Sequence, residues 1–162
     1  MRQLLAPGTG RRLAGWLLAT VVATVAAGAL LPQLAFNATA SLPGSLYWLC
    51  PLQEVERDQV VALRPPANRF YPPGMRFLKR IEGLPGDRVS WLGRQVRING
   101  RPLGRARTAS RDGRPLPRGP AGVIPPGHYF VWTPHRDSYD SRYADIGWVA
   151  RERVLARAVR LL

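Results

Sequence analysis

The sequence predicts a mainly β domain behind a single N-terminal membrane helix. Short apolar segments alternate with turn signals along most of the chain, which contains 16 glycines and 16 prolines in 162 residues. One long apolar stretch without charges lies near the N-terminus. The length suits a membrane segment and one domain of about 120 residues, so a single domain is expected.

The apolar stretch at 13–31 consists mainly of Leu, Val and Ala. A helix needs about 20 apolar residues to cross a bilayer. Basic residues on the N-terminal side of such a helix favour a cytoplasmic N-terminus. They are Arg2, Arg11 and Arg12. We therefore expect a cytoplasmic N-terminus at 1–12, a transmembrane anchor at 13–33 and an exported domain at 34–162.

A cleaved secretory signal is the competing interpretation of this segment. Ala38-Thr39-Ala40 is the small-residue pattern on which such signals end. However, the apolar stretch is longer than the roughly 7–15 residues of a signal peptide. An uncleaved anchor is the preferred interpretation.

Turn signals divide the exported part into short strands. A hairpin is expected across Gly93-Arg94, and Asn99-Gly100 is a second turn. Residues 104–122 are rich in Arg, Gly and Pro without hydrophobic periodicity, so an exposed loop is expected there. The predicted strands are 46–48, 59–63, 75–82, 88–92, 95–98, 101–103, 128–132, 147–149 and 154–161.

The formal net charge is +14, and 23 of the 24 basic residues are arginines. They are mixed with acidic residues from Arg57 to Arg160, which favours a solvated surface over a nucleic-acid site. Attraction to anionic lipid is also expected because the chain carries an anchor. The single cysteine, Cys50, excludes an intramolecular disulfide and is expected to be a buried, inert thiol. No metal or cofactor is expected.

The single lysine, Lys79, is the strongest chemical signal in the composition. A lysine with a depressed pKa can act as a base, whereas an arginine cannot. Strand alternation places Phe77, Lys79 and Ile81 on one face, where a charged amine is costly. Lys79 is therefore a candidate general base for a serine nucleophile.

A Ser-His-Asp arrangement is an alternative, because His128 and His135 lie near Asp137 and Asp140 in the sequence. Neither histidine accompanies a motif that presents a nucleophile, such as Gly-x-Ser-x-Gly. The lysine is preferred.

Three longer strings resemble, in order, the characteristic boxes of type I signal peptidases. They are 37–43 (NATASLP), 79–87 (KRIEGLPGD) and 138–143 (SYDSRY). The Ser-Leu-Pro of the first box, followed by Leu46-Tyr47, is similar to the conjugative-transfer signal peptidases of TraF type. The resemblance extends over roughly residues 13 to 160, and it implies the antiparallel β fold of that family.

The resemblance implies that Ser41 attacks the scissile carbonyl and that Lys79 takes its proton. The Ser41 amide and the Thr39 hydroxyl would form the oxyanion hole, where fixed donors meet the developing charge. Ser138 corresponds to the serine that orients the lysine amine.

Asp140 and Arg142 correspond to a supporting ion pair. Leu42 stands where signal peptidases often have methionine, and Ser45 where TraF-like sequences usually have glycine. Residues 133–137 replace the usual Gly-Asp-Asn-Arg opening of the last box. These departures favour a specialised peptidase over a general one.

The implied activity is endoproteolysis of an exported, membrane-associated precursor at the bacterial inner membrane, with a pilin as the expected substrate of a TraF-type enzyme. Two alternatives remain open: a general type I signal peptidase, and an inactive, membrane-tethered binding component of a transfer apparatus.

Overall fold

The computed structural model describes residues 9–39, 41–66, 71 and 74–162, in two compact units, Met1–Leu34 and Ala35–Leu162. In the first unit, helix α1 (Thr9–Leu30) continues into the 3-10 helix η1 (Leu31–Gln33). The large apolar side chains of α1 are exposed. An apolar surface all round suits a lipid environment, and the helix is long and apolar enough to cross a membrane. The expected boundaries at 12 and 33 stay predictions.

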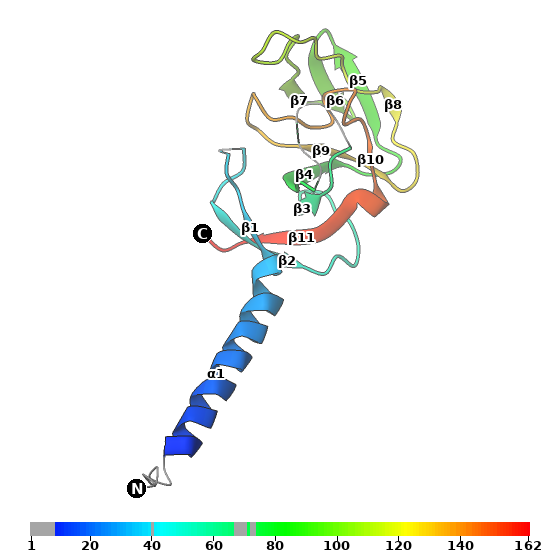
Figure 1. The fold of residues 1–162 in the computed structure, drawn as a ribbon. Coiled ribbons are helices and arrows are strands. Elements are labelled where there is room, and N and C mark those ends of the chain that lie inside the picture. The colour runs from blue at the N-terminus through cyan, green and yellow to red at the C-terminus, as the bar shows by residue number, and fades with distance from the viewer. Residues whose placement is uncertain (1–8, 40, 67–70, 72–73) are drawn as a thin grey trace, which may run out of the picture. The chain divides into compact units, whose positions relative to one another are not determined.

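The second unit is mainly β, as the sequence predicted, and consists of two antiparallel sheets (Figure 1). The larger sheet has the strand order β1-β2-β11-β3-β4-β9-β10, and the smaller has the order β7-β6-β5-β8. The strands are β1 (Leu34–Phe36), β2 (Leu46–Cys50), β3 (Val60–Leu63), β4 (Phe77–Gly83), β5 (Arg88–Leu92), β6 (Gln95–Ile98), β7 (Arg101–Arg105), β8 (Gly122–Val123), β9 (His128–Trp132), β10 (Val149–Ala150) and β11 (Val154–Arg160).

The hairpin of β5 and β6 and the strand β9 have the predicted bounds. Near the C-terminus the prediction was less accurate: 147–149 contributes only Val149 to β10, and the 3-10 helix η2 (Arg151–Arg153) follows. The Arg151 amide donates to the Gly127 carbonyl at 2.8 Å. This hydrogen bond lies directly after β10, where the chain turns into η2.

The expected exposed loop at 104–122 is present, but contacts that the sequence did not predict fix parts of this segment to the core. Strand β7 extends to Arg105, and Ala106 and Leu116 are buried in the main core. The Arg94 guanidinium donates to the carbonyls of Ala106, Arg107 and Leu116. The guanidinium of Arg94 therefore holds this segment in place by hydrogen bonds, although the segment has no hydrophobic periodicity.

The apolar run at 46–50 alternates in burial, with Tyr47 and Leu49 inside. They pack with Leu42, Ala62 and Ala158 in a small core cluster. Cys50, at the end of β2, is only half-buried, which corrects the expectation of a buried thiol.

Strand β4 lies in the larger sheet between β3 and β9, with Lys79 opposite Val61 of β3. Phe77 and Ile81, two residues before and after the lysine, belong to the main core. The predicted alternation along this strand is confirmed, and Lys79 is the buried polar residue of an apolar face.

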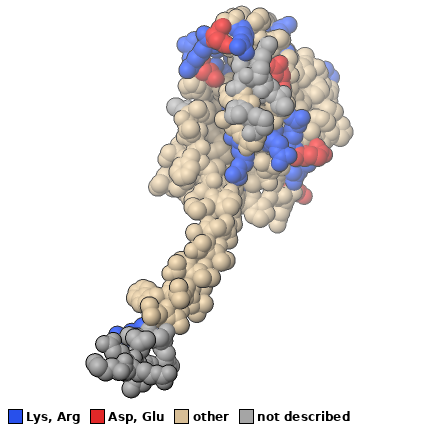
Figure 2. Space-filling view, in the orientation of Figure 1, with Lys and Arg blue, Asp and Glu red and all other residues tan. Residues whose placement is uncertain are grey.

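On the molecular surface shown in Figure 2, basic and acidic side chains lie close together.

Candidate active site

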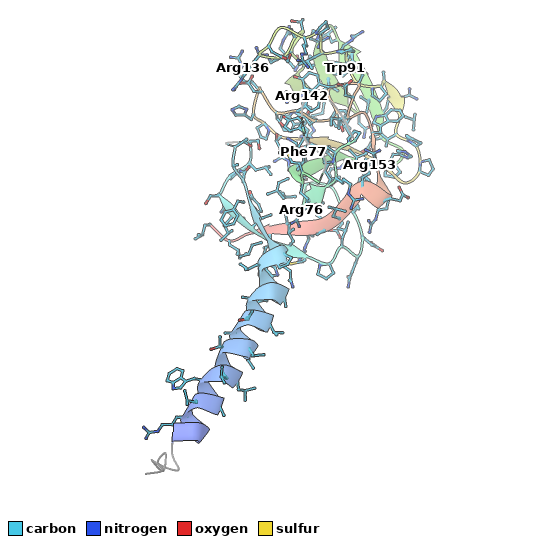
Figure 3. All side chains as sticks on the ribbon, in the orientation of Figure 1. Arg76, Phe77, Trp91, Arg136, Arg142 and Arg153 are labelled. Atoms are coloured by element: carbon cyan, nitrogen blue, oxygen red, sulfur yellow. The ribbon has the colours of Figure 1, made fainter. Side chains whose placement is uncertain are left out.

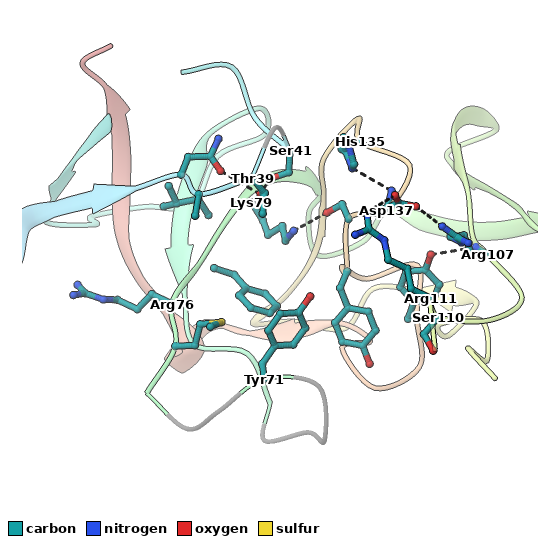
Figure 4. Close-up of a pocket in the computed structure, with 18 of the residues that line it drawn as sticks. Thr39, Ser41, Tyr71, Arg76, Lys79, Arg107, Ser110, Arg111, His135 and Asp137 are labelled. Atoms are coloured by element: carbon teal, nitrogen blue, oxygen red, sulfur yellow. Dashed lines mark hydrogen bonds and ion pairs between the residues drawn. The ribbon is translucent and has the colours of Figure 1, made fainter. Parts of the chain in front are cut away.

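A pocket of about 890 Å³ brings together several of the predicted site residues (Figure 4). Thr39, Ser41, Lys79 and Ser138 all line it. They come from the turn before β2, from the middle of β4 and from the segment after β9. Residues almost 100 positions apart in the sequence therefore share one cavity.

The turn that carries Ser41 is held by side-chain hydrogen bonds. Asn37 Nδ2 donates to the carbonyl of Leu42 at 2.9 Å and to that of Gly44 at 3.0 Å. The hydroxyls of Thr39 and Ser41 are 2.8 Å apart, and either can donate. Ser41 is thus buried and fixed on a tight turn, with the Thr39 hydroxyl beside its oxygen. Ala40 lies outside the described residues, so the alternative cleavage pattern at 38–40 is untested.

The Lys79 side chain is 7% exposed. Burial lowers its pKa from 10.5 to about 8; Asp140 opposes this effect, while Arg142 adds to it. The amine donates a 2.6 Å hydrogen bond to Ser138 Oγ and lies 5.4 Å from the centre of the Phe77 ring. The surroundings of Lys79 thus raise the share of neutral amine near neutral pH.

Ser41 and Lys79 line the same pocket but do not share a hydrogen bond within the described part of the chain. The Ser41 oxygen pairs with Thr39, and the lysine amine pairs with Ser138. Catalytic hydrogen bonds are often formed only once a substrate is bound.

Thr133 belongs to this network and was missed by the sequence analysis. Its side chain is fully buried, and its hydroxyl donates to Ser138 Oγ at 2.6 Å. Ser138 Oγ therefore lies between Thr133 and Lys79. The sequence pointed to this residue only through the unusual opening of the last box, which begins at residue 133.

Asp140 and Arg142 form the predicted ion pair, and both side chains are almost completely buried. Figure 3 shows the position of Arg142 in the β unit. The guanidinium binds both carboxylate oxygens, at 2.8 and 2.9 Å. It also donates to the carbonyls of Ser138 and Arg105, both at 2.9 Å. The pair therefore joins the segment that carries Ser138 to the end of β7.

The histidines do not form the alternative triad. His135 Nδ1 accepts from the Asp137 amide at 3.2 Å, and His128 Nδ1 lies 3.0 Å from the Pro126 carbonyl. Among the hydrogen bonds of residues 9–39, 41–66, 71 and 74–162, none joins either histidine to a serine hydroxyl. Over the same residues, no group of three or more His, Cys, Asp or Glu could hold a metal ion.

A second ionic cluster, also not foreseen, lies on the pocket wall. Asp137 binds Arg107 Nη1 at 2.5 Å and Arg111 Nη2 at 3.0 Å, and all three residues line the pocket. The two arginines lower the pKa of Asp137 to about 2. The cluster attaches the segment after β7 to the segment that carries Ser138.

Comparison with known proteins now identifies the family. Residues 11–162 match the family model "Signal peptidase, peptidase S26". The chain belongs to the signal peptidase family. Together with helix α1, which is long and apolar enough to cross a membrane, this family membership indicates a membrane-anchored protein.

The relatives include a conjugal transfer protein and a probable signal peptidase. "Conjugal transfer protein TraF" of Agrobacterium fabrum is 32% identical over 125 residues, covering 66% of this chain and 70% of the relative. "Probable signal peptidase I-2" of Synechocystis sp. is 37% identical over 112 residues, covering 66% of this chain and 48% of the relative. The chain thus spans about half the length of the Synechocystis signal peptidase.

Among solved structures, a signal peptidase I from Enterococcus faecalis V583 matches with a TM-score of 0.44 and 26% identity. The match covers 66% of this chain and 98% of the Enterococcus chain.

Proposed function

We propose that this signal peptidase is a serine endopeptidase in which Ser41 is the nucleophile and Lys79 the general base. The observation that carries the proposal is the buried amine of Lys79. Its pKa is lowered to about 8, it is held by Ser138, and it lines the same pocket as Ser41. A neutral amine in this position can take the proton of a serine hydroxyl.

In the proposed reaction, Ser41 Oγ bonds to the scissile carbonyl carbon while its proton passes to Lys79 Nζ. The Ser41 amide and the Thr39 hydroxyl donate to the oxyanion. When the carbon–nitrogen bond breaks, Lys79 returns the proton to the leaving amine. Water, deprotonated by Lys79, then attacks the acyl carbon, and Lys79 returns the proton to Ser41 Oγ as the ester bond breaks. Before attack, the Ser41 hydroxyl has to donate toward Lys79, and the Thr39 hydroxyl has to exchange its contact with Ser41 for one with the oxyanion.

We propose that the substrates are exported precursors at the bacterial inner membrane, with the N-terminus of the enzyme in the cytoplasm. The TraF relative favours a precursor of the conjugative transfer apparatus, such as a pilin. An amine of the precursor could then replace water and give a cyclic product. The Synechocystis relative supports the second candidate, a general signal peptidase.

The test is cleavage of a pilin-type and a general secretory precursor by the full chain in detergent. We expect Ser41→Ala and Lys79→Arg to abolish cleavage, and Arg88→Lys, an exposed change in β5, to retain it. An undiminished Lys79→Arg enzyme would exclude the lysine base. If the wild-type chain binds but does not cleave either precursor, the inactive binding component is the better description. Mass spectrometry distinguishes a linear product from a cyclic one, which lacks one water.

A further inference from the structure

The pocket wall formed by Arg107, Arg111 and Asp137 has a net positive charge. Asp137 is the only anion in this cluster, and each of its carboxylate oxygens contacts one of the two arginines. The neighbouring anion, Asp112, also lines the pocket and forms an ion pair with Arg114 at 2.7 Å. Among the described residues, the cluster of Arg107, Arg111 and Asp137 therefore has two cations for one anion.

Arg107 holds the wall in place. Its amide donates to the Tyr143 hydroxyl at 3.1 Å, and its carbonyl accepts from Arg94. Its side chain is 37% exposed and has the shorter contact with Asp137. Arg107 and Asp137 are therefore enough to join the segment after β7 to the segment that carries Ser138.

Arg111 adds little to this attachment, because its side chain is 81% exposed and exposed ion pairs contribute weakly to stability. Its side chain nevertheless lines the pocket, and Figure 4 shows it extending beside Asp137 at the end of the cavity away from Thr39. Within the described residues, its guanidinium contacts Asp137 through Nη2 alone. The other N–H groups remain available to a ligand, in the planar arrangement that suits a carboxylate.

We propose that Arg111, supported by Arg107, binds an acidic side chain of the precursor that lies a few residues from the scissile bond. The substrate class is then an exported polypeptide with Asp or Glu within a few residues of its cleavage site. This inference rests on the proposed function, because it treats the pocket as the peptide-binding site.

The test uses synthetic peptides that contain an Ala-x-Ala cleavage sequence. Members of each set differ only by Glu, Gln or Lys at one of three positions on either side of the scissile bond. Dissociation constants are measured with the full chain in detergent, in a Ser41→Ala background. We expect Glu at one position to bind about fivefold more tightly than Gln, the effect of a partly exposed ion pair. Arg111→Gln should remove this preference, and Arg111→Glu should transfer it to Lys.

Arg136→Gln is the matched control. Arg136 is also next to Asp137, at 3.8 Å, but it is 83% exposed and is not among the pocket-lining residues. It should leave the preference unchanged. Equal binding of Glu and Gln at every position would overturn the inference, as would a preference that survives Arg111→Gln or is lost equally in Arg136→Gln. Because binding is measured without turnover, these outcomes are independent of whether the wild-type chain cleaves a peptide.

Discussion

Lys79 Nζ donates a 2.6 Å hydrogen bond to Ser138 Oγ in the buried part of the pocket. Its partner comes from a segment 59 residues further along the chain. The bond fixes the direction of a side chain with four rotatable bonds, and burial keeps its pKa near 8. Ser138 therefore fixes the position of the proposed base, whereas burial sets its protonation. Substitutions can change the two separately.

The pH dependence of cleavage tests the protonation of Lys79. A general base acts in its neutral form, so kcat/KM should rise about tenfold per pH unit below 8 and level off above it. Ser138→Ala removes the hydrogen-bond partner and should lower kcat by about 100-fold through misplacement of the amine. Rates measured from pH 6 to 10 check both. A profile without an inflection near pH 8 would contradict the lysine base.

Thr133 is expected to be a positioning residue. Thr133→Val keeps the shape of the side chain but removes the donor to Ser138, so kcat should fall roughly three- to tenfold while KM stays constant. Thr133→Ser retains a hydroxyl and should restore most of the rate. If both variants lose the same activity, or if KM changes instead of kcat, the hydroxyl has no such role.

Asp140→Asn should change both stability and pH dependence. The variant leaves Arg142 buried without its anion, and breaking a buried ion pair from one side costs about 3–5 kcal/mol. The charge of Asp140 raises the pKa of Lys79, so its removal should shift the pH–rate midpoint to lower pH. Denaturant unfolding and the pH profile measure the two effects. Asp145→Asn, which removes an exposed carboxylate that binds Tyr139, should leave the midpoint in place.

The sequence was most informative where a regular pattern coincided with chemistry. The alternation in β4 located Lys79 on an apolar face without the structure, and the turn signals located most strands. Ser41 and Ser138 came only from the family resemblance, because a serine in a turn has no periodicity of its own. Sequence reasoning did not reveal the ordered part of 104–122 or the cluster around Asp137. Both depend on arginine contacts with residues far along the chain, such as Arg107 and Asp137, 30 positions apart.

Two glycines with similar backbone conformations provide a matched test of the nucleophile turn. Gly44 and Gly86 have φ angles of +88° and +90°. A Cβ at Gly86 would meet open space, whereas one at Gly44 would overlap the Leu162 carbonyl and the Arg160 side chain. Gly86→Ala should therefore cost about 1–2 kcal/mol from backbone strain alone, and Gly44→Ala about 1–3 kcal/mol more. Cleavage should fall only in Gly44→Ala. Equal unfolding free energies would contradict the close packing of this turn.

The stability of the protein should also depend on the pKa of Lys79. The pKa of Lys79 is about 8 in the folded chain and 10.5 for an unperturbed lysine, which represents the unfolded chain. Between pH 8 and pH 10.5 the unfolded chain therefore binds more protons than the folded chain. The free energy of unfolding should therefore rise with pH across this interval, by about 3 kcal/mol in total. Lys79→Met has no such titration and keeps an apolar side chain of similar length.

The measurement is the unfolding free energy of the two full chains in detergent from pH 7 to 10.5, expressed as wild type minus Lys79→Met. Other titrating groups cancel in this difference. The wild type should gain on the variant as pH rises, with most of the gain above pH 8. Parallel curves would show that the folded chain does not depress the pKa of the amine, and the proposed base would then be protonated at neutral pH.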